Sequence, residues 1–262
     1  MAMTVPEAVA FYEERMEETL EAAAAAKALG DFYHAAEMQE QFLKNGLIAG
    51  LNRWRHSLGD PRVPFDRAVA GSQQFMAELA KLDPSQTPWK HHRFELADYL
   101  RVLIGKPVET QRLRECLGNP LPGRKEMARM LLEERLLDMA VLLRLLTGEC
   151  WTMWDQLLQQ HAEKKRLKLL VATYQSYWDL LTALEARDTA RATQLAEQLA
   201  GLYLQRENNG YYSGGVEYEG GGPDNPHAVD FRLAAILKSY AERSVSLMLP
   251  EGFIHSWRRH NA

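Results

Sequence analysis

The chain has few of the residues that mark small secreted domains or membrane proteins. Its 262 residues include only two cysteines, Cys116 and Cys150, too few for a disulfide scaffold or a thiolate zinc site. We expect both to be ordinary buried thiols of a reducing compartment. No run approaches the ~18 apolar residues of a membrane span, and the N-terminus lacks the basic start and apolar stretch of a signal peptide. These absences predict a cytoplasmic protein with no membrane partner.

An excess of basic residues is also missing. The formal net charge is −4 at pH 7, whereas general binders of nucleic acids and of anionic membranes carry surplus lysine and arginine. Hydrophobic residues make up 46% and charged residues 25% of the chain, which is an ordinary composition for a globular protein. The sequence therefore predicts a soluble folded protein that does not bind nucleic acid, and its slight acidity suits a basic partner.

Alternation of apolar and polar residues, the signature of strands, is scarce, and helix boundaries recur instead. Thr4, Pro6 and Glu7 have the form of an N-cap, a helix-opening proline and an early acidic residue, and Asp31 and Asp188 can cap later helices. We expect helices over about 5–29, 31–58, 65–82, 88–104 and 122–146, and a short helix that ends at 117. A further helix should begin at 151 or 154, two more should meet at 187–188, and another should begin near 227. A last helical turn is expected near 253–257.

The architecture follows from these boundaries. Short turns between successive helices predict stacked antiparallel helical hairpins, and the lack of a long linker predicts one compact all-α domain over residues 1–262. The stretch 122–146 is apolar around most of its circumference, so we expect it to be the central helix. We expect the core to include four aromatic residues, Trp54, Tyr99, Trp154 and Trp178.

Residue patterns typical of enzymes are weak. No histidine has a glutamate three residues before it, as the di-iron helical bundles require. His91 and His92 lie near Glu95, and His34 lies near Glu37, but two ligands do not make a metal site. Neither cysteine has a local signature of a catalytic nucleophile. We therefore expect no catalytic residue, no metal site and no cofactor.

Two features are suited to binding a protein. The first expected helix carries an acidic face, Glu13, Glu14, Glu17, Glu18 and Glu21, which would attract a basic partner, although a solvated face partly relieved by Arg15 explains the same pattern. The second is the Gly/Tyr segment, residues 207–226 (ENNGYYSGGVEYEGGGPDNP), which cannot sustain a helix. Between Arg206 and Arg232 the chain has no lysine or arginine.

Tyrosine among small flexible residues is the chemistry of adaptable binding loops, whereas a self-packed loop is the simpler interpretation of the same segment. Its carboxylates would imitate phosphates or pair with basic residues of a target, and we count Asp230 with this acidic stretch. The predicted partner-binding residues are Tyr211, Tyr212, Glu217, Tyr218, Glu219 and Asp224, with Glu14 and Glu18 on the first helix as a second surface.

Two stretches resemble a known family. YWDLLTALEARDTARATQLAEQLAGLY and, after the Gly/Tyr segment, HAVDFRLAAILKSYAERSVSLMLPEGFIHSW resemble the C-terminal half of helical immunity proteins of bacterial polymorphic-toxin and type VI secretion systems, nearest to the immunity protein 49 family. The resemblance covers residues 170–257 and transfers no site residue. It implies a cytosolic antitoxin that binds a cognate toxin domain and blocks its active site or substrate entry, and we expect stoichiometric occlusion of the active site. Toxins of such systems are often nucleases, which would suit an acidic inhibitor.

Two other classes of function stay open. One is an adaptor whose helical hairpins hold a peptide or protein in a groove. The other is a helical metal-dependent enzyme, which stoichiometric metal lost on substitution of His91 and His92 would reveal. The oligomeric state is also left open by the sequence.

Overall fold

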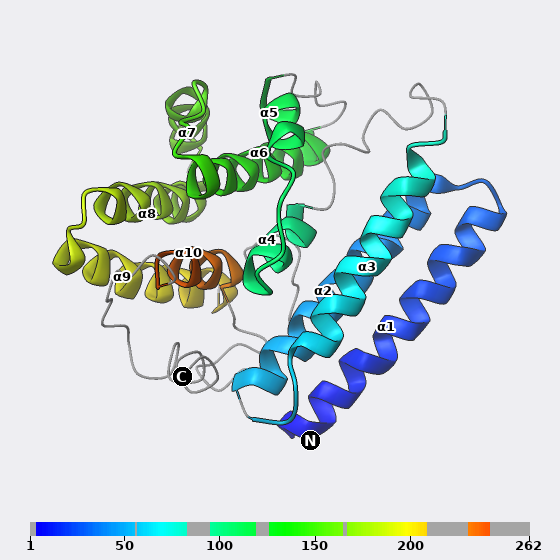
Figure 1. Ribbon diagram of the computed structural model, residues 1–262. Coiled ribbons are helices and arrows are strands. Elements are labelled where there is room, and N and C mark those ends of the chain that lie inside the picture. Colours follow the sequence, from blue (N-terminus) through cyan, green and yellow to red (C-terminus); the bar gives the residue numbers. More distant parts are fainter. Residues whose placement is uncertain are drawn as a thin grey trace. The chain divides into compact units, whose positions relative to one another are not determined.

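The computed structural model describes residues 4–55, 57–82, 95–118, 126–164, 167–208 and 230–241 (Figure 1). Over these ranges the chain forms ten α-helices and no β-strand, which confirms the prediction of an all-helical protein. None of the helices in these ranges is long and apolar enough to cross a lipid bilayer. The first part of the expected helix 88–104 and the turn expected near 253–257 lie outside the described residues.

The chain divides into two compact units, one reaching from the N-terminus to Lys106 and the other starting at Pro107. Within each unit, successive helices joined by short turns pack against each other as hairpins: α1 on α2, α2 on α3, and α8 on α9. The expectation that residues 1–262 form a single domain stays a prediction.

The first unit contains α1 (Val5–Ala28), α2 (Phe32–Arg55), α3 (Arg62–Leu79) and α4 (Glu95–Leu103). The boundary between α1 and α2 lies where the sequence predicts it. The Glu7 carboxylate accepts a hydrogen bond from the Thr4 backbone N–H at 2.8 Å, forming a capping box. Gly30 has φ +75° after the last turn of α1, and the Asp31 carboxylate accepts a hydrogen bond from the His34 backbone N–H at 3.0 Å, capping α2.

The start of α3 differs from the expected residue 65. Proline within a helix normally ends it. The first turn tolerates proline, because the backbone N–H groups of that turn have no acceptor within the helix. The helix therefore begins at Arg62 and contains Pro64 in its first turn. The Asp60 carboxylate accepts the Arg62 backbone N–H at 2.9 Å, which satisfies one of those groups.

Glycines allow α2 and α3 to approach each other closely. A Cβ atom at Gly50 would lie 2.2 Å from the ring of Phe65, and one at Gly46 would lie 2.7 Å from Cβ of Ala68. Any larger side chain at these two positions would therefore separate the helices.

Ion pairs join α1 to both neighbouring helices of this unit. Glu13 pairs with Arg53 of α2 at 2.5 Å, Glu17 pairs with Arg67 of α3, and Lys27 pairs with Glu78 of α3 at 2.6 Å. The last two pairs connect helices that are not adjacent in the chain, and both sit at the partly exposed surface.

These pairs predict a loss of stability in acid. The hydrogen bond from Lys27 lowers the pKa of Glu78 below its usual 4.5, and the hydrogen bond from Arg67 lowers the pKa of Glu17 in the same way. A carboxyl group with a lowered folded-state pKa stabilises the fold above its unfolded pKa, and this contribution disappears as the pH falls through the folded value. Exposed pairs contribute about 0.2–1 kcal/mol each.

Denaturant unfolding at pH 7 and pH 3 checks this expectation. Between the two pH values the Glu17→Gln/Glu78→Gln variant should lose less unfolding free energy than the unaltered chain. Glu14→Gln is the control, because the described residues offer Glu14 no ion pair. An equal loss in all three proteins would contradict the assignment.

The second unit contains α5 (Thr110–Gly118), α6 (Glu126–Thr147), α7 (Trp154–Ala162), α8 (Lys168–Glu185), α9 (Thr189–Asn208) and α10 (Phe231–Ala241). α6 contacts α5, α7 and α8, and every residue from 136 to 145 is buried. The prediction that this apolar stretch is central is confirmed for the second unit.

The hairpin of α8 and α9 turns at the residues that the sequence indicated. Arg187 adopts φ +58°, and the Asp188 carboxylate accepts a hydrogen bond from the Arg191 backbone N–H at 3.0 Å, capping α9. α9 continues to Asn208, two residues into the Gly/Tyr segment.

Some expectations about the core need correction. Cys116 is buried as expected, but Cys150 is exposed, because it follows the last turn of the buried helix α6 and lies in the connection to α7. Tyr99 and Trp154 are buried. Trp178 is only half-buried, with the Arg144 guanidinium 4.3 Å from the centre of its ring. The side chain of Trp54 lies outside the described part.

Candidate functional site

The six predicted binding residues of the Gly/Tyr segment, Tyr211, Tyr212, Glu217, Tyr218, Glu219 and Asp224, lie outside the described residues. The structure does describe the chain on either side of them. α9 ends at Asn208 and α10 starts at Phe231, and both helices pack on α8. The segment therefore connects two helices that share one packing partner.

The second predicted surface, on α1, is less acidic than the sequence indicates. Glu14 and Glu18 are both exposed, and Glu18 pairs with Arg15 at 2.6 Å, the local relief that the sequence had left open. Arg53 and Arg67 come from α2 and α3 to neutralise Glu13 and Glu17. The spacing of residues along α1 could not predict this neutralisation, because the two arginines belong to other helices.

The histidine clusters do not form a metal centre within the described part of the chain. His34 lies on the exposed surface with Nδ1 at 3.4 Å from the Glu37 carboxylate, and His91 and His92 fall outside the described ranges. Across those ranges, no group of three or more histidine, cysteine, aspartate or glutamate residues is arranged to hold a metal ion.

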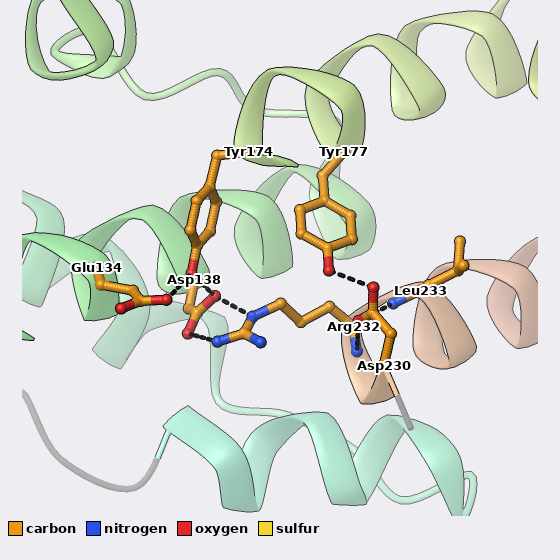
Figure 2. A network of polar contacts seen from close by, with 7 residues as sticks. All are labelled: Glu134, Asp138, Tyr174, Tyr177, Asp230, Arg232 and Leu233. Atoms are coloured by element: carbon orange, nitrogen blue, oxygen red, sulfur yellow. Dashed lines mark hydrogen bonds and ion pairs between the residues drawn. The ribbon is translucent and has the colours of Figure 1, made fainter. Parts of the chain in front are cut away.

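A buried polar cluster occupies the interior of the second unit. It consists of side chains from three helices, Glu134 and Asp138 of α6, Tyr174 and Tyr177 of α8, and Arg232 of α10, together with Asp230 just before α10 (Figure 2). Figure 2 shows the Arg232 side chain reaching from the start of α10 to Asp138, with the two tyrosine rings descending from α8. No sequence motif had identified these residues as a group.

The centre of the cluster is a bidentate ion pair. The Arg232 guanidinium donates through Nε and Nη2 to the two carboxylate oxygens of Asp138, the Nη2 bond measuring 2.6 Å, and both side chains are 1% exposed. The Tyr174 hydroxyl donates to Asp138 at 2.6 Å and lies 3.4 Å from Glu134. A buried charge is tolerated when it is paired and hydrogen-bonded in this way.

The pKa of Arg232 reflects this environment. Burial opposes the charged guanidinium, but the Asp138 carboxylate and the oxygens of Tyr174 and Tyr177 outweigh burial and raise the pKa of Arg232 well above its usual value. Arg232 is therefore charged at neutral pH.

Asp230 links the same cluster to the helix terminus. Its carboxylate accepts hydrogen bonds from the backbone N–H groups of Arg232 and Leu233, both at 3.1 Å, and so caps α10. The Tyr177 hydroxyl of α8 also donates to Asp230. Asp230 is fully buried, so its inclusion in an acidic surface was wrong. Its carboxylate lies in the core because it accepts hydrogen bonds from the first turn of α10 and from the Tyr177 hydroxyl.

The cluster connects α6, α8 and the start of α10 to one another. All six side chains are buried, and their hydrogen bonds run between helices that lie as many as 94 residues apart in the chain. One feature of the sequence indicates a buried polar cluster: Glu134 and Asp138 are carboxylates four residues apart on a helix that is otherwise largely apolar. A carboxylate on such a helix needs a buried partner, but the partner's identity depends on the fold.

Comparison of this chain with protein-family models, with curated proteins and with solved structures gave no match.

Proposed function

We propose that this chain is an immunity protein that neutralises a cognate toxin by binding it in a fixed ratio and covering its active site. The proposal rests first on the resemblance of residues 170–257 to helical immunity proteins of polymorphic-toxin and type VI secretion systems. A nuclease is the class of toxin that such an inhibitor would fit, because carboxylates interleaved with tyrosines resemble the phosphates and bases that a nuclease binds.

The observation that carries the proposal is how the two helices that flank the Gly/Tyr segment are held. Its preceding helix, α9, and its following helix, α10, both pack on α8, and a buried ion pair with a capped helix start fixes α10. Variable loops mounted on a rigid scaffold are the usual arrangement of binding sites. Tyrosines contribute large contact areas at low cost in side-chain entropy.

The exposed carboxylates of Glu14 and Glu18 support an acidic partner-binding surface of lower charge than the sequence indicated. Because Glu18 is paired with Arg15, we expect this surface to guide the approach of a basic partner more than to determine its affinity.

Co-expression tests the class of function. The toxin domain encoded beside the gene for this chain should stop growth when expressed alone, and this chain should restore growth and form a complex of defined ratio with that domain. Binding of an extended peptide instead of a folded domain would favour the adaptor. Turnover of a substrate by the chain alone would favour the enzyme.

Affinity measurements test the site. Replacing Tyr211, Tyr212, Glu217, Tyr218, Glu219 and Asp224 together by alanine should weaken toxin binding by at least about 100-fold, with unchanged helical circular dichroism and melting temperature. Glu14→Gln/Glu18→Gln should mainly slow association at low salt. Glu115→Gln, an exposed glutamate on α5, is the matched control. Full affinity in the six-residue variant would refute the assignment of the segment.

A further inference from the structure

α10 is buried around its whole circumference over its first two turns. Every residue from 231 to 237 is at most 8% exposed, whereas a helix at the surface of a protein leaves one face to solvent. Successive residues of a helix point about 100° apart, so the apolar groups of α10 face nearly every direction: Phe231, Leu233, Ala234, Ala235, Ile236 and Leu237. α10 is therefore a core helix of the second unit.

Apolar burial by itself restrains the position of such a helix weakly. The hydrophobic effect is non-directional, so a rotation of α10 about its axis would exchange one set of apolar contacts for another. The chain adds little restraint, because α9 ends at Asn208 and α10 begins at Phe231. A connection of this length costs nearly the same free energy to close at several starting points of the next helix.

Arg232 supplies the directional contacts that the apolar residues lack. It is the only charged residue between 231 and 237, and its guanidinium donates to both carboxylate oxygens of Asp138 on α6 (Figure 2). A two-pronged pair of this kind has a defined geometry. The Tyr174 hydroxyl of α8 donates to the same carboxylate. The pair therefore determines which side of α10 is turned toward α6.

Asp230 restrains the start of the same helix. Its carboxylate accepts hydrogen bonds from the backbone N–H groups of Arg232 and Leu233, and it also accepts one from the Tyr177 hydroxyl of α8. This contact places the first turn of α10 at one point along α8, whereas the ion pair fixes the rotation of the helix.

Any other position of α10 separates the two charges. A shift by one helical turn moves the helix about 5.4 Å along its axis, and half a rotation turns Arg232 to the opposite side. Either change leaves the guanidinium and the Asp138 carboxylate unpaired in apolar surroundings, which is strongly unfavourable. In coiled coils a single buried polar residue fixes register in the same way, at a cost in stability.

We propose that the Asp138–Arg232 pair is a register lock, which holds α10 at one axial position and one rotation in the core of the second unit. This role is distinct from stabilisation. Apolar residues of similar volume at both positions would keep the core filled, but they would leave several positions of α10 close in free energy. The lock belongs to the second unit alone and is independent of the partner that the chain binds.

Methyl NMR of the full chain, labelled with ¹³C at the isoleucine δ1 methyl groups, provides a probe inside α10. The chain has four isoleucines: Ile48, Ile104, Ile236 and Ile254. Ile236 of α10 is fully buried, and Ile48 of α2 is a buried residue of the first unit that serves as an internal reference. The spectrum of Ile236→Val identifies the Ile236 signal by its loss.

The unaltered chain should give one sharp Ile236 signal. In Asp138→Leu/Arg232→Met the Ile236 signal should split, or broaden through exchange on the μs–ms timescale, because α10 occupies more than one position. The Ile48 signal should stay unchanged, and circular dichroism should show the same helical content.

Tyr174→Phe is the matched control, because it removes a hydroxyl that donates to Asp138 and leaves the ion pair in place. This variant should lose stability and still give one sharp Ile236 signal. A split or broadened signal in Tyr174→Phe would mean that any loss within the cluster loosens α10, and would overturn the specific role of the pair.

A single sharp Ile236 signal in a folded Asp138→Leu/Arg232→Met protein would also overturn the proposal, because apolar packing alone would then fix α10. Arg232→Lys decides the question if the double variant does not fold. Lysine keeps the charge but lacks the planar fork of the guanidinium, so the Ile236 signal should broaden. An Ile236 signal as sharp as in the unaltered chain would then refute the lock.

Discussion

Asp138→Ala is expected to lower the unfolding free energy of the second unit by about 3–5 kcal/mol, because it leaves the Arg232 guanidinium buried without its counter-ion. Arg232 is 1% exposed and donates two hydrogen bonds to Asp138. The Tyr174 hydroxyl would also lose its 2.6 Å acceptor. A loss of this size is a large part of the stability of a typical domain, which is about 5–15 kcal/mol.

A paired substitution distinguishes the cost of an unpaired charge from the value of the pair itself. Asp138→Leu/Arg232→Met removes both charges and keeps apolar volume, so it should be far less destabilising than either single change. Denaturant unfolding followed by circular dichroism measures the four proteins of the comparison: the unaltered chain, Asp138→Leu, Arg232→Met and the double variant. Additive losses in the double variant would mean that the two side chains stabilise the unit independently, contrary to the geometry in Figure 2.

Trp154→Ala should cost a similar amount, about 3–5 kcal/mol, because it empties a large buried site. Trp154 is 2% exposed. Its ring stacks on Trp178 with centroids 4.1 Å apart and meets Tyr174 edge-on at 6.4 Å. These contacts attach α7 to α8, so the loss falls on the packing between these helices.

Trp154→Phe is the matched control for this site. The indole nitrogen of Trp154 is buried and has no acceptor among the described residues. Phenylalanine therefore keeps much of the aromatic contact and removes a donor whose burial is unfavourable. We expect less than half the cost of the alanine variant in the same unfolding assay. Equal costs would show that the indole nitrogen has a partner or that the smaller ring cannot pack.

Under the proposed function, these two sites matter because they hold the helices next to the Gly/Tyr segment. Asp138 and Arg232 hold the start of α10, and Trp154 holds α7 on α8, the helix that both α9 and α10 contact. A weaker scaffold would present the segment less rigidly, and affinity for a partner depends in part on that rigidity. Variants of the scaffold should therefore be compared with variants of the segment only after their stability is known.

Much of the local structure could be read from the sequence. The Thr4–Glu7 capping box and the Asp31 and Asp188 caps each involve residues within three positions of one another. Such short-range hydrogen bonds form wherever the backbone begins a helix, so residue type and spacing are sufficient to predict them. The misplaced start of α3 arose from Pro64, which a first helical turn accommodates.

Charges were harder to interpret than helix ends. Five glutamates on one helix indicated an acidic surface, but arginines of α2 and α3 neutralise two of them. Asp230 looked like part of an acidic loop, and the fold buries it as the cap of α10. In each case the partner comes from another helix, and its approach depends on packing.

The order of helices, their caps and the all-helical class were determined by the sequence alone, because they depend on hydrogen bonds and periodicities within a few residues. Tertiary structure decided the pairing of Asp138 with Arg232 across 94 residues, the burial of Asp230 as the cap of α10, and the neutralisation of Glu13 and Glu17 by arginines of α2 and α3. These features arise where separate helices meet, and the spacing of residues along one helix holds no information about what lies opposite.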